Sequence, residues 1–360
     1  MHIYRRIMKN IFFVLISLLA LPSLAQTEVN AFFTGANEGT TYYLPDTRIE
    51  VTVGTVCITK TPGEFNRYAE RFLRINNAIS KSETFWEMNE ITIGFSGKPN
   101  PDKMFTVKLA NGRTASNISI DENGIIESIN VHSEKKEKNA EQPRNEAPES
   151  ANASQYMTEE MLQATSTAKL AELTAKEIYT IRESKLAITR GLSENMPKDG
   201  LSMQLILDEL NKQEKVLTEM FTGRIDTVYH KTTHILEPKA ECDTAKAVLF
   251  RFSRKLGIVD SNNLAGSPIY YSLKDLKSVK LPTPEELAKK KPLKKDGICY
   301  NIPGKAEFKI YTPTRTLYRK EISLAQLGTT EILSKVLFNK NTGTKVIFDT
   351  STGGIVSIEK

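Results

Sequence analysis

The sequence is poor in the residues that most often build reactive centres. Its 360 residues include one tryptophan, four histidines and three cysteines, Cys57, Cys242 and Cys299. No two cysteines are close enough for a Cys-x-x-Cys metal or redox motif. An odd number of cysteines disfavours a disulfide framework, so we interpret them as three buried thiols. One disulfide with one free thiol remains the alternative if the chain folds in an oxidising compartment.

Two histidines, His230 and His234, have a spacing of four residues. On a helix this spacing would bring both rings to one metal ion, but the surrounding Thr and Tyr residues favour a strand. In a strand the two rings would lie about 13 Å apart along one face. No glutamate lies between them, as a zinc-protease helix would require. We therefore expect no metal site here.

Other catalytic patterns are missing or incomplete. The sequence has no Gly-x-Ser-x-Gly elbow. The segment 121–124 lacks the full ligand pattern of a calcium loop. The segment 94–98 ends in Gly-Lys but lacks the length of a phosphate-binding loop, and we interpret it as a turn that ends a strand. The sequence therefore predicts no catalytic residue, no cofactor and no metal.

Positive charge is scarce once the first residues are set aside. The formal net charge is +6, and Arg5, Arg6 and Lys9 supply three of these charges, which leaves +6 − 3 = +3. This value is too small to indicate nucleic acid or anionic lipid as a partner. A lysine cluster in 289–295 is interpreted as a solvated loop, and contact with acidic glycans is the alternative.

The first 25 residues have the layout of a secretory signal peptide. A basic start precedes the apolar run 11–20, and Ser23-Leu24-Ala25 supplies small residues for cleavage. The apolar run is too short to span a bilayer comfortably, although a retained anchor is the alternative. Translation could start at Met1 or Met8. We expect an exported protein, periplasmic or peripheral to the outer membrane, with no transmembrane span after cleavage.

The remaining sequence predicts an α+β fold with two β-rich regions separated by a long antiparallel helical hairpin. Residues 26–133 form the N-terminal β-rich domain, with strands expected at 48–59, 86–95 and 104–109 and a short helix at 64–73. Residues 134–157 are rich in charge and read as a flexible linker. Residues 224–360 form the C-terminal β-rich domain, with six further strands expected.

The hairpin occupies residues 158–223. Its first helix is expected from 158 to 190, about 50 Å long, because this stretch contains no Gly or Pro. Its second helix is expected from 201 to 222 and ends at Gly223. Apolar residues recur on one face of each helix, which is more typical of core packing than of a partner surface.

The two β-rich regions end in similar hairpins. Residues 118–129 and 346–358 each contain a strand, an Asp that opens a glycine-containing turn, and a Ser-Ile pair in the return strand. Duplication of one module would explain this likeness. Independent hairpins also converge on such patterns, so this remains a hypothesis.

Several stretches resemble the domain-of-unknown-function family 4831, known from exported envelope proteins of Bacteroidetes. They are Thr41–Pro45, Pro62–Arg71, Ser166–Glu172, Ile178–Ser184, Leu249–Ser253 and Ile302–Gly304. The resemblance implies no activity and no catalytic residue. We expect the polar residues in these stretches to form a structural cluster in which buried ion pairs attach a helix to the β regions; they are Arg67, Glu70, Arg182, Glu183 and Arg251.

These observations favour a non-enzymatic binding or scaffold protein that contacts an envelope protein partner. The first alternative is a glycan-binding module, in which Trp86 would stack on a sugar, although strand aromatics are mostly core residues. The second alternative is a hydrolase with a non-standard site.

Overall fold

The structure is a computed structural model that describes residues 40–107, 118–131, 152–193, 199–240, 243–280, 297–334 and 344–359. The predicted signal peptide, most of the predicted linker, Cys242 and the lysine cluster lie outside these residues. Within them, no helix combines the length and the apolar character needed to cross a membrane.

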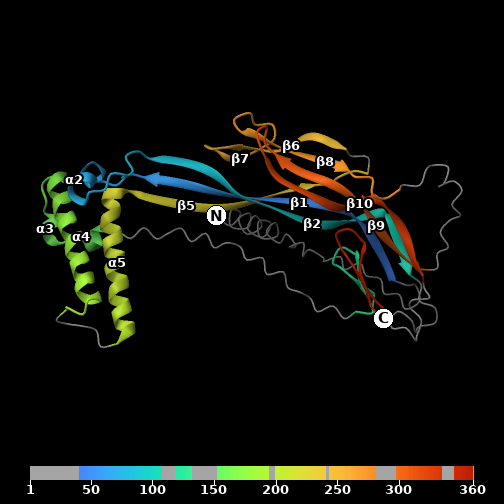
Figure 1. The fold of residues 1–360 in the computed structure, drawn as a ribbon, viewed down its shortest axis with the longest axis horizontal. Coiled ribbons are helices and arrows are strands. Elements are labelled where there is room, and N and C mark those ends of the chain that lie inside the picture. The colour runs from blue at the N-terminus through green and yellow to red at the C-terminus, as the bar shows by residue number, and fades with distance from the viewer. Residues whose placement is uncertain are drawn as a thin grey trace, which may run out of the picture. The chain divides into compact units, whose positions relative to one another are not determined.

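The described strands form three antiparallel sheets, and Figure 1 labels the strands of the three-stranded and five-stranded sheets. The three-stranded sheet contains β2 (Glu83–Val107), β1 (Thr40–Thr61) and β5 (Arg224–Leu236), in that order. The five-stranded sheet contains β10 (Thr316–Ser334), β9 (Gly297–Tyr311), β8 (Ser267–Asp275), β6 (Thr244–Ser253) and β7 (Gly257–Val259). The four-stranded sheet contains β12 (Ile355–Glu359), β11 (Lys345–Phe348), β4 (Ile126–Ile129) and β3 (Ile118–Ile120).

The two β-rich regions are separate in the sequence but share sheets in space. β1 pairs with β5 from Ile49 opposite Leu236 to Thr61 opposite Arg224. β4 pairs with β11 in the four-stranded sheet. The structure is rich in strand, as predicted, and its helices lie in the sequence between strands β4 and β5. The ranges 26–133 and 224–360 nevertheless contribute strands to common sheets.

The two predicted terminal hairpins are neighbours within the four-stranded sheet. β3 pairs with β4, β11 pairs with β12, and β11 joins the two hairpins by pairing with β4. Gly124 in the first turn and Gly353 in the second have positive φ angles, which glycine adopts without steric cost. Their origin by duplication stays a hypothesis.

The largest apolar core is built from strands of two sheets. Ile49, Val51 and Val53 of β1 are fully buried and belong to one cluster with Phe250 and Phe308 of the five-stranded sheet. The alternation along β1 explains this arrangement, because every second side chain of a strand points to the same face.

The predicted helical hairpin consists of α4 (Thr167–Thr189) and α5 (Gly200–Thr222), which lie side by side (Figure 1). The first helix was predicted to begin at residue 158, and this is wrong. The short α3 (Glu159–Leu162) comes first, and Ser166 caps a new helix by accepting a hydrogen bond from the backbone N–H of Lys169. A cap satisfies a backbone donor at the helix start, so α4 is only about 35 Å long.

Two other expectations concern the first β-rich region. The short helix near residues 64–73 is confirmed as a 3-10 turn, Asn66–Tyr68, followed by α2 (Ala69–Leu73). The turn expected at residues 94–98 is wrong, because β2 continues through it. A Cβ atom at Gly97 would lie 2.1 Å from the carbonyl oxygen of Thr350. The glycine therefore permits a close approach of another chain segment rather than a turn.

Candidate functional site

A polar cluster joins the two helices of the hairpin. Glu214 of α5 accepts hydrogen bonds from Nε of Arg182 at 2.6 Å and from Nζ of Lys185 at 2.5 Å. Lys185 also donates to the side chain of Asn211 at 2.7 Å. Partial burial raises the pKa of Glu214, but the bonds from Lys185 and Arg182 outweigh it and hold this pKa below its usual value. The cluster therefore acts as an ionised clasp between the helices.

The five polar residues expected to form one structural cluster have different positions. Arg182 pairs with Glu214 inside the hairpin, so it does not attach the helix to the β regions as expected. Arg251 donates to the carbonyl oxygens of Ser261 and Gly266 and orders a loop of the five-stranded sheet. Exposed positions are occupied by Arg67, Glu70 and Glu183. Among the described residues, no ion pair joins any two of the five.

The predicted glycan contact, Trp86, is a packing residue in this structure. A Cβ atom at Gly257 would lie 2.9 Å from the indole ring, so the ring covers this glycine. The ring centroid of His230 lies 4.9 Å from that of Trp86. Trp86 is half-buried as a result, and these contacts occupy part of the surface that a sugar would use.

The histidine pair lies on β5, as its composition predicts. His230 is exposed beside Trp86, whereas the ring of His234 stacks on Phe250 with centroids 4.9 Å apart and planes 7° apart. Burial lowers the pKa of His234. No group of three His, Cys, Asp or Glu side chains with metal-binding geometry occurs in the described part of the chain. Cys57 and Cys299 are free thiols, half-buried and buried respectively.

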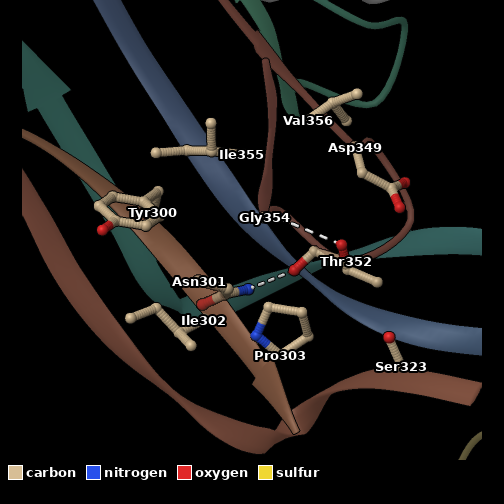
Figure 2. Close-up of a pocket in the computed structure, with 10 residues that line it drawn as sticks. All are labelled: Tyr300, Asn301, Ile302, Pro303, Ser323, Asp349, Thr352, Gly354, Ile355 and Val356. Atoms are coloured by element: carbon tan, nitrogen blue, oxygen red, sulfur yellow. Dashed lines mark hydrogen bonds between the residues drawn. The ribbon is translucent and has the colours of Figure 1, made fainter. Parts of the chain in front are cut away.

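An open cleft of about 400 Å³ lies beside the turn between β11 and β12 (Figure 2). Asn301 at its base is buried and donates from Nδ2 to the carbonyl oxygens of Pro45 and Thr352 at 3.1 and 2.9 Å. Its backbone N–H also donates to the carbonyl oxygen of Gly353 at 2.9 Å. Asn301 therefore connects β1, β9 and the C-terminal turn.

The polar groups of this cleft hold its walls together. The side chain of Asp349 accepts two hydrogen bonds from Ser351, and Oγ1 of Thr352 accepts one from the N–H of Gly354. Asp349 is the single carboxylate and no histidine occurs among the described lining residues. These bonds give the cleft a structural role, and the geometry supplies no nucleophile paired with a base.

β5 is an edge strand of the three-stranded sheet and directly follows the hairpin in the sequence. β5 pairs with β1 along all thirteen residues, and no other described strand pairs with it. Ile225, Tyr229 and Ile235 are 56%, 51% and 57% exposed. The sequence predicted a strand here but not its position at an edge, because strand order depends on contacts distant in the sequence.

Comparison with family profiles identifies the chain. The profile described as "Domain of unknown function (DUF4831)" matches residues 38–356, which include the hairpin and every described strand except the end of β12. The chain belongs to the DUF4831 family. The resemblance found in the sequence is thereby confirmed. No curated protein and no solved structure gives a significant match to this DUF4831 chain.

Proposed function

We propose that this DUF4831 chain is an exported, non-catalytic binding protein of the cell envelope that captures an extended segment of a partner protein along β5. The observation that carries the proposal is the outer edge of β5 over Arg224–Leu236, with which no strand in the described part of the chain pairs. An edge strand presents backbone N–H and C=O groups that can pair with a strand from another chain. The signal-peptide layout of the first 25 residues supports the location.

The side chains of β5 indicate the chemistry of the added strand. Every second side chain of a strand points to the same face of the sheet. One face of β5 therefore carries Ile225, Thr227, Tyr229, Lys231 and Thr233. Cross-strand neighbours are the pairs that stabilise a sheet. Apolar or β-branched residues would pair with the isoleucine and tyrosine side chains. An acidic residue would pair with Lys231, which is exposed and has no ion pair among the described residues.

Natural edges are usually protected, and β5 has little protection. Proteins block strand addition with prolines, bulges, inward-pointing charges or charged side chains such as lysine on the edge, and of the last kind β5 has one lysine, Lys231. β5 contains no proline and no register shift against β1. Its single acid, Asp226, is paired with Arg224 at 2.8 Å. These features support a strand that receives a partner.

Site-specific photo-crosslinking tests this function. A photoreactive residue replaces Tyr229 in the full chain, expressed in its native envelope, and a second chain carries it at Lys274 as a control. Lys274 is exposed on β8, a strand paired on both sides. We expect one adduct of reproducible mass at position 229 and none at 274. Equal labelling at both positions, or no adduct at 229, would contradict the proposal.

A second variant tests whether the edge itself makes the contact. Ile225→Lys combined with Ile235→Lys places charges along the exposed face without disturbing a buried side chain. The adduct should fall about five-fold or more, while circular dichroism and thermal unfolding stay unchanged. An adduct of twice the chain mass would show pairing with a second copy and would overturn capture of a different protein.

A further inference from the structure

The sequence of β5 is nearly symmetric about its central residue, His230. β5 contains thirteen residues, so equal lengths of strand lie on the two sides of this histidine. Residues at equal distances from the centre match in type at several places: Ile225 with Ile235, Thr227 with Thr233, and the β-branched Val228 with Thr232. Two antiparallel strands run in opposite directions, so a symmetric sequence can pair with a second copy of itself.

Pairing of two identical strands restricts the registers that are possible. A two-fold axis perpendicular to the sheet relates the copies, and the same patch of both chains then forms the interface. Side chains directly opposite each other lie on one face of the sheet, so the axis passes beside a residue and not between two residues. An axis beside His230 pairs Arg224 with Leu236 of the second copy and engages all thirteen residues of β5. Any other axis leaves one end of the strand unpaired.

One face of β5 gains favourable neighbours in this register. Its cross-strand pairs, each formed twice by the symmetry, are Ile225 with Ile235, Thr227 with Thr233, and Tyr229 with Lys231. Ile225 and Ile235 are 56% and 57% exposed in the single chain, so the pair would remove part of both side chains from water. The ammonium group of Lys231 would lie near the ring of Tyr229, where a cation–π contact is favourable.

The other face contains no conflict of charge. Its cross-strand pairs are Arg224 with Leu236, Asp226 with His234, Val228 with Thr232, and His230 with its own copy. No pair on this face joins two like charges while the histidines are neutral. Both faces of β5 are therefore compatible with an axis beside His230.

The registers on either side are less favourable. The nearest alternatives place the axis beside Tyr229 or beside Lys231. An axis beside Lys231 brings this lysine opposite its own copy, and like charges directly opposite each other destabilise a sheet. An axis beside Tyr229 places the exposed Ile225 opposite Thr233 and leaves Ile235 beyond the end of the second β5. The sequence thus favours the one register that also engages the whole strand.

Self-pairing would also cover an edge that has little protection of its own. A bare edge strand is a template for uncontrolled addition of other strands. Two paired β5 strands would form one six-stranded sheet in the order β2-β1-β5-β5-β1-β2, in which β5 has a neighbour on both sides. A second copy would therefore cover the outer backbone groups of β5, with which no described strand of the single chain pairs.

We propose that β5 pairs with β5 of a second copy about a two-fold axis beside His230, and that this dimer covers the capture edge until a partner strand replaces the copy. The second statement rests on the proposed function, because both uses require the same edge. The first statement rests only on the exposed edge and on the symmetry of its sequence. Self-pairing thus regulates access to β5.

Disulfide crosslinking tests the register in the purified mature chain. Serine replaces Cys57 and Cys242 in the background, whereas Cys299 is buried and is kept. The residue introduced by His230→Cys would lie opposite its own copy, with Cα atoms about 4.5–5.5 Å apart, a distance that a disulfide can bridge. Thr227→Cys is the matched control, since its own copy would lie about 20 Å away along the strand. Oxidation should give at least about ten-fold more linked dimer from His230→Cys, and equal yields would overturn the proposal.

Sedimentation velocity of charge variants tests the same pairing without a covalent bond. Tyr229→Lys places a lysine opposite Lys231 on both sides of the axis, so the dimer dissociation constant should rise at least about ten-fold. Tyr229→Lys combined with Lys231→Glu restores opposite charges and should recover the wild-type constant to within about three-fold. Lys274→Glu, on β8, should leave the constant unchanged. A wild type that stays monomeric at about 0.1 mM, or no recovery in the combined variant, would overturn the proposal.

The failure of self-pairing and the failure of capture have different signatures. A photoreactive residue at Tyr229 should give an adduct of twice the chain mass in the purified chain. In the native envelope, the same residue should give the adduct of a different protein. If the second adduct forms without the first, the dimer is overturned and capture stands. If both settings give only the adduct of twice the chain mass, capture is overturned and the dimer stands.

Discussion

The hydroxyl of Tyr42 forms two hydrogen bonds with the backbone of Cys299. It accepts from the N–H at 2.7 Å and donates to the carbonyl oxygen at 3.0 Å. Tyr42 is fully buried, and burial raises the pKa of its hydroxyl. One side chain of β1 thus satisfies both backbone groups of a residue in β9, so it connects the start of the described chain with the C-terminal strands.

Tyr42→Phe should destabilise the protein by about 3 kcal/mol. The variant keeps the ring but leaves one donor and one acceptor of Cys299 buried without a partner, and each costs about 1–3 kcal/mol. Urea unfolding followed by circular dichroism measures the change. Tyr229→Phe is the control, because the side chain of Tyr229 is half exposed and its hydroxyl forms no hydrogen bond with the residues that the structure describes. A loss below about 1 kcal/mol in Tyr42→Phe would contradict this role.

The clasp of Glu214 predicts a loss of stability in acid. Arg182 and Lys185 hold the pKa of Glu214 below its unfolded value, which is 4.5. The ionised carboxylate of Glu214 contributes fully to the free energy of unfolding above pH 4.5. This contribution disappears as the pH falls through the lower pKa of the folded state. Partial exposure of Arg182 limits the contribution to about 1 kcal/mol. Glu214→Gln should remove it at neutral pH and reduce the acid dependence, as measured by thermal unfolding across this range.

A matched variant separates the clasp from general charge effects. Glu183→Gln removes an exposed carboxylate from α4, the helix that also carries Arg182 and Lys185. This carboxylate forms no ion pair among the described residues. Its unfolding should follow the wild type at each pH. Equal acid dependence in the wild type and in Glu214→Gln would show that the clasp contributes nothing measurable.

Local patterns predicted most elements of this fold. Alternating apolar residues predicted a strand within β1, further strands were predicted within β6, β8, β9, β10, β11 and β12, and Gly223 predicted the end of α5. Local rules failed where a competing local signal was overlooked, as at the Ser166 cap. They also failed at Gly97, where a glycine serves a distant contact with Thr350 rather than a turn.

The features of the candidate sites depend on long-range contacts and were harder to predict. The role of Glu214 follows from the register of two antiparallel helices, which the sequence alone leaves open. The free edge of β5 follows from strand order, which brings β1 and β5 together from opposite sides of the hairpin. The sequence shows leucines near the start of α5, such as Leu201 and Leu205. Only the packing in the structure shows that their side chains are exposed.

His234 predicts a second loss of stability in acid, which begins at a higher pH than that of Glu214 and has a different cause. Burial lowers its pKa from 6.5, and its Nε2 atom is buried with no hydrogen-bond partner among the described residues. The unfolded chain therefore binds a proton more readily, so stability falls as the pH drops below the unfolded pKa. His234→Phe keeps the stacking on Phe250 but removes the titration. The variant should gain stability relative to the wild type between about pH 7 and about pH 5.

The control for this histidine is its neighbour on the same strand. His230→Phe also preserves an aromatic contact with Trp86 but changes an exposed ring. The stability of His230→Phe relative to the wild type should be the same at about pH 7 and at about pH 5. Chemical denaturation at each pH measures the two differences. A parallel change in both variants would attribute the effect to strand propensity rather than to titration.

Gly97 and Gly200 predict opposite effects of the same substitution. Gly97→Ala should destabilise the protein by about 2 kcal/mol or more, because the new Cβ atom would lie 2.1 Å from the backbone oxygen of Thr350 and 2.9 Å from Ile125 and Pro45. Gly200→Ala meets no atom within 4 Å at the start of α5. It should be neutral or stabilise by up to about 1 kcal/mol, since alanine favours helices. Urea unfolding of both variants compares them directly, and a neutral Gly97→Ala would show that β2 and the C-terminal turn are not held in close contact.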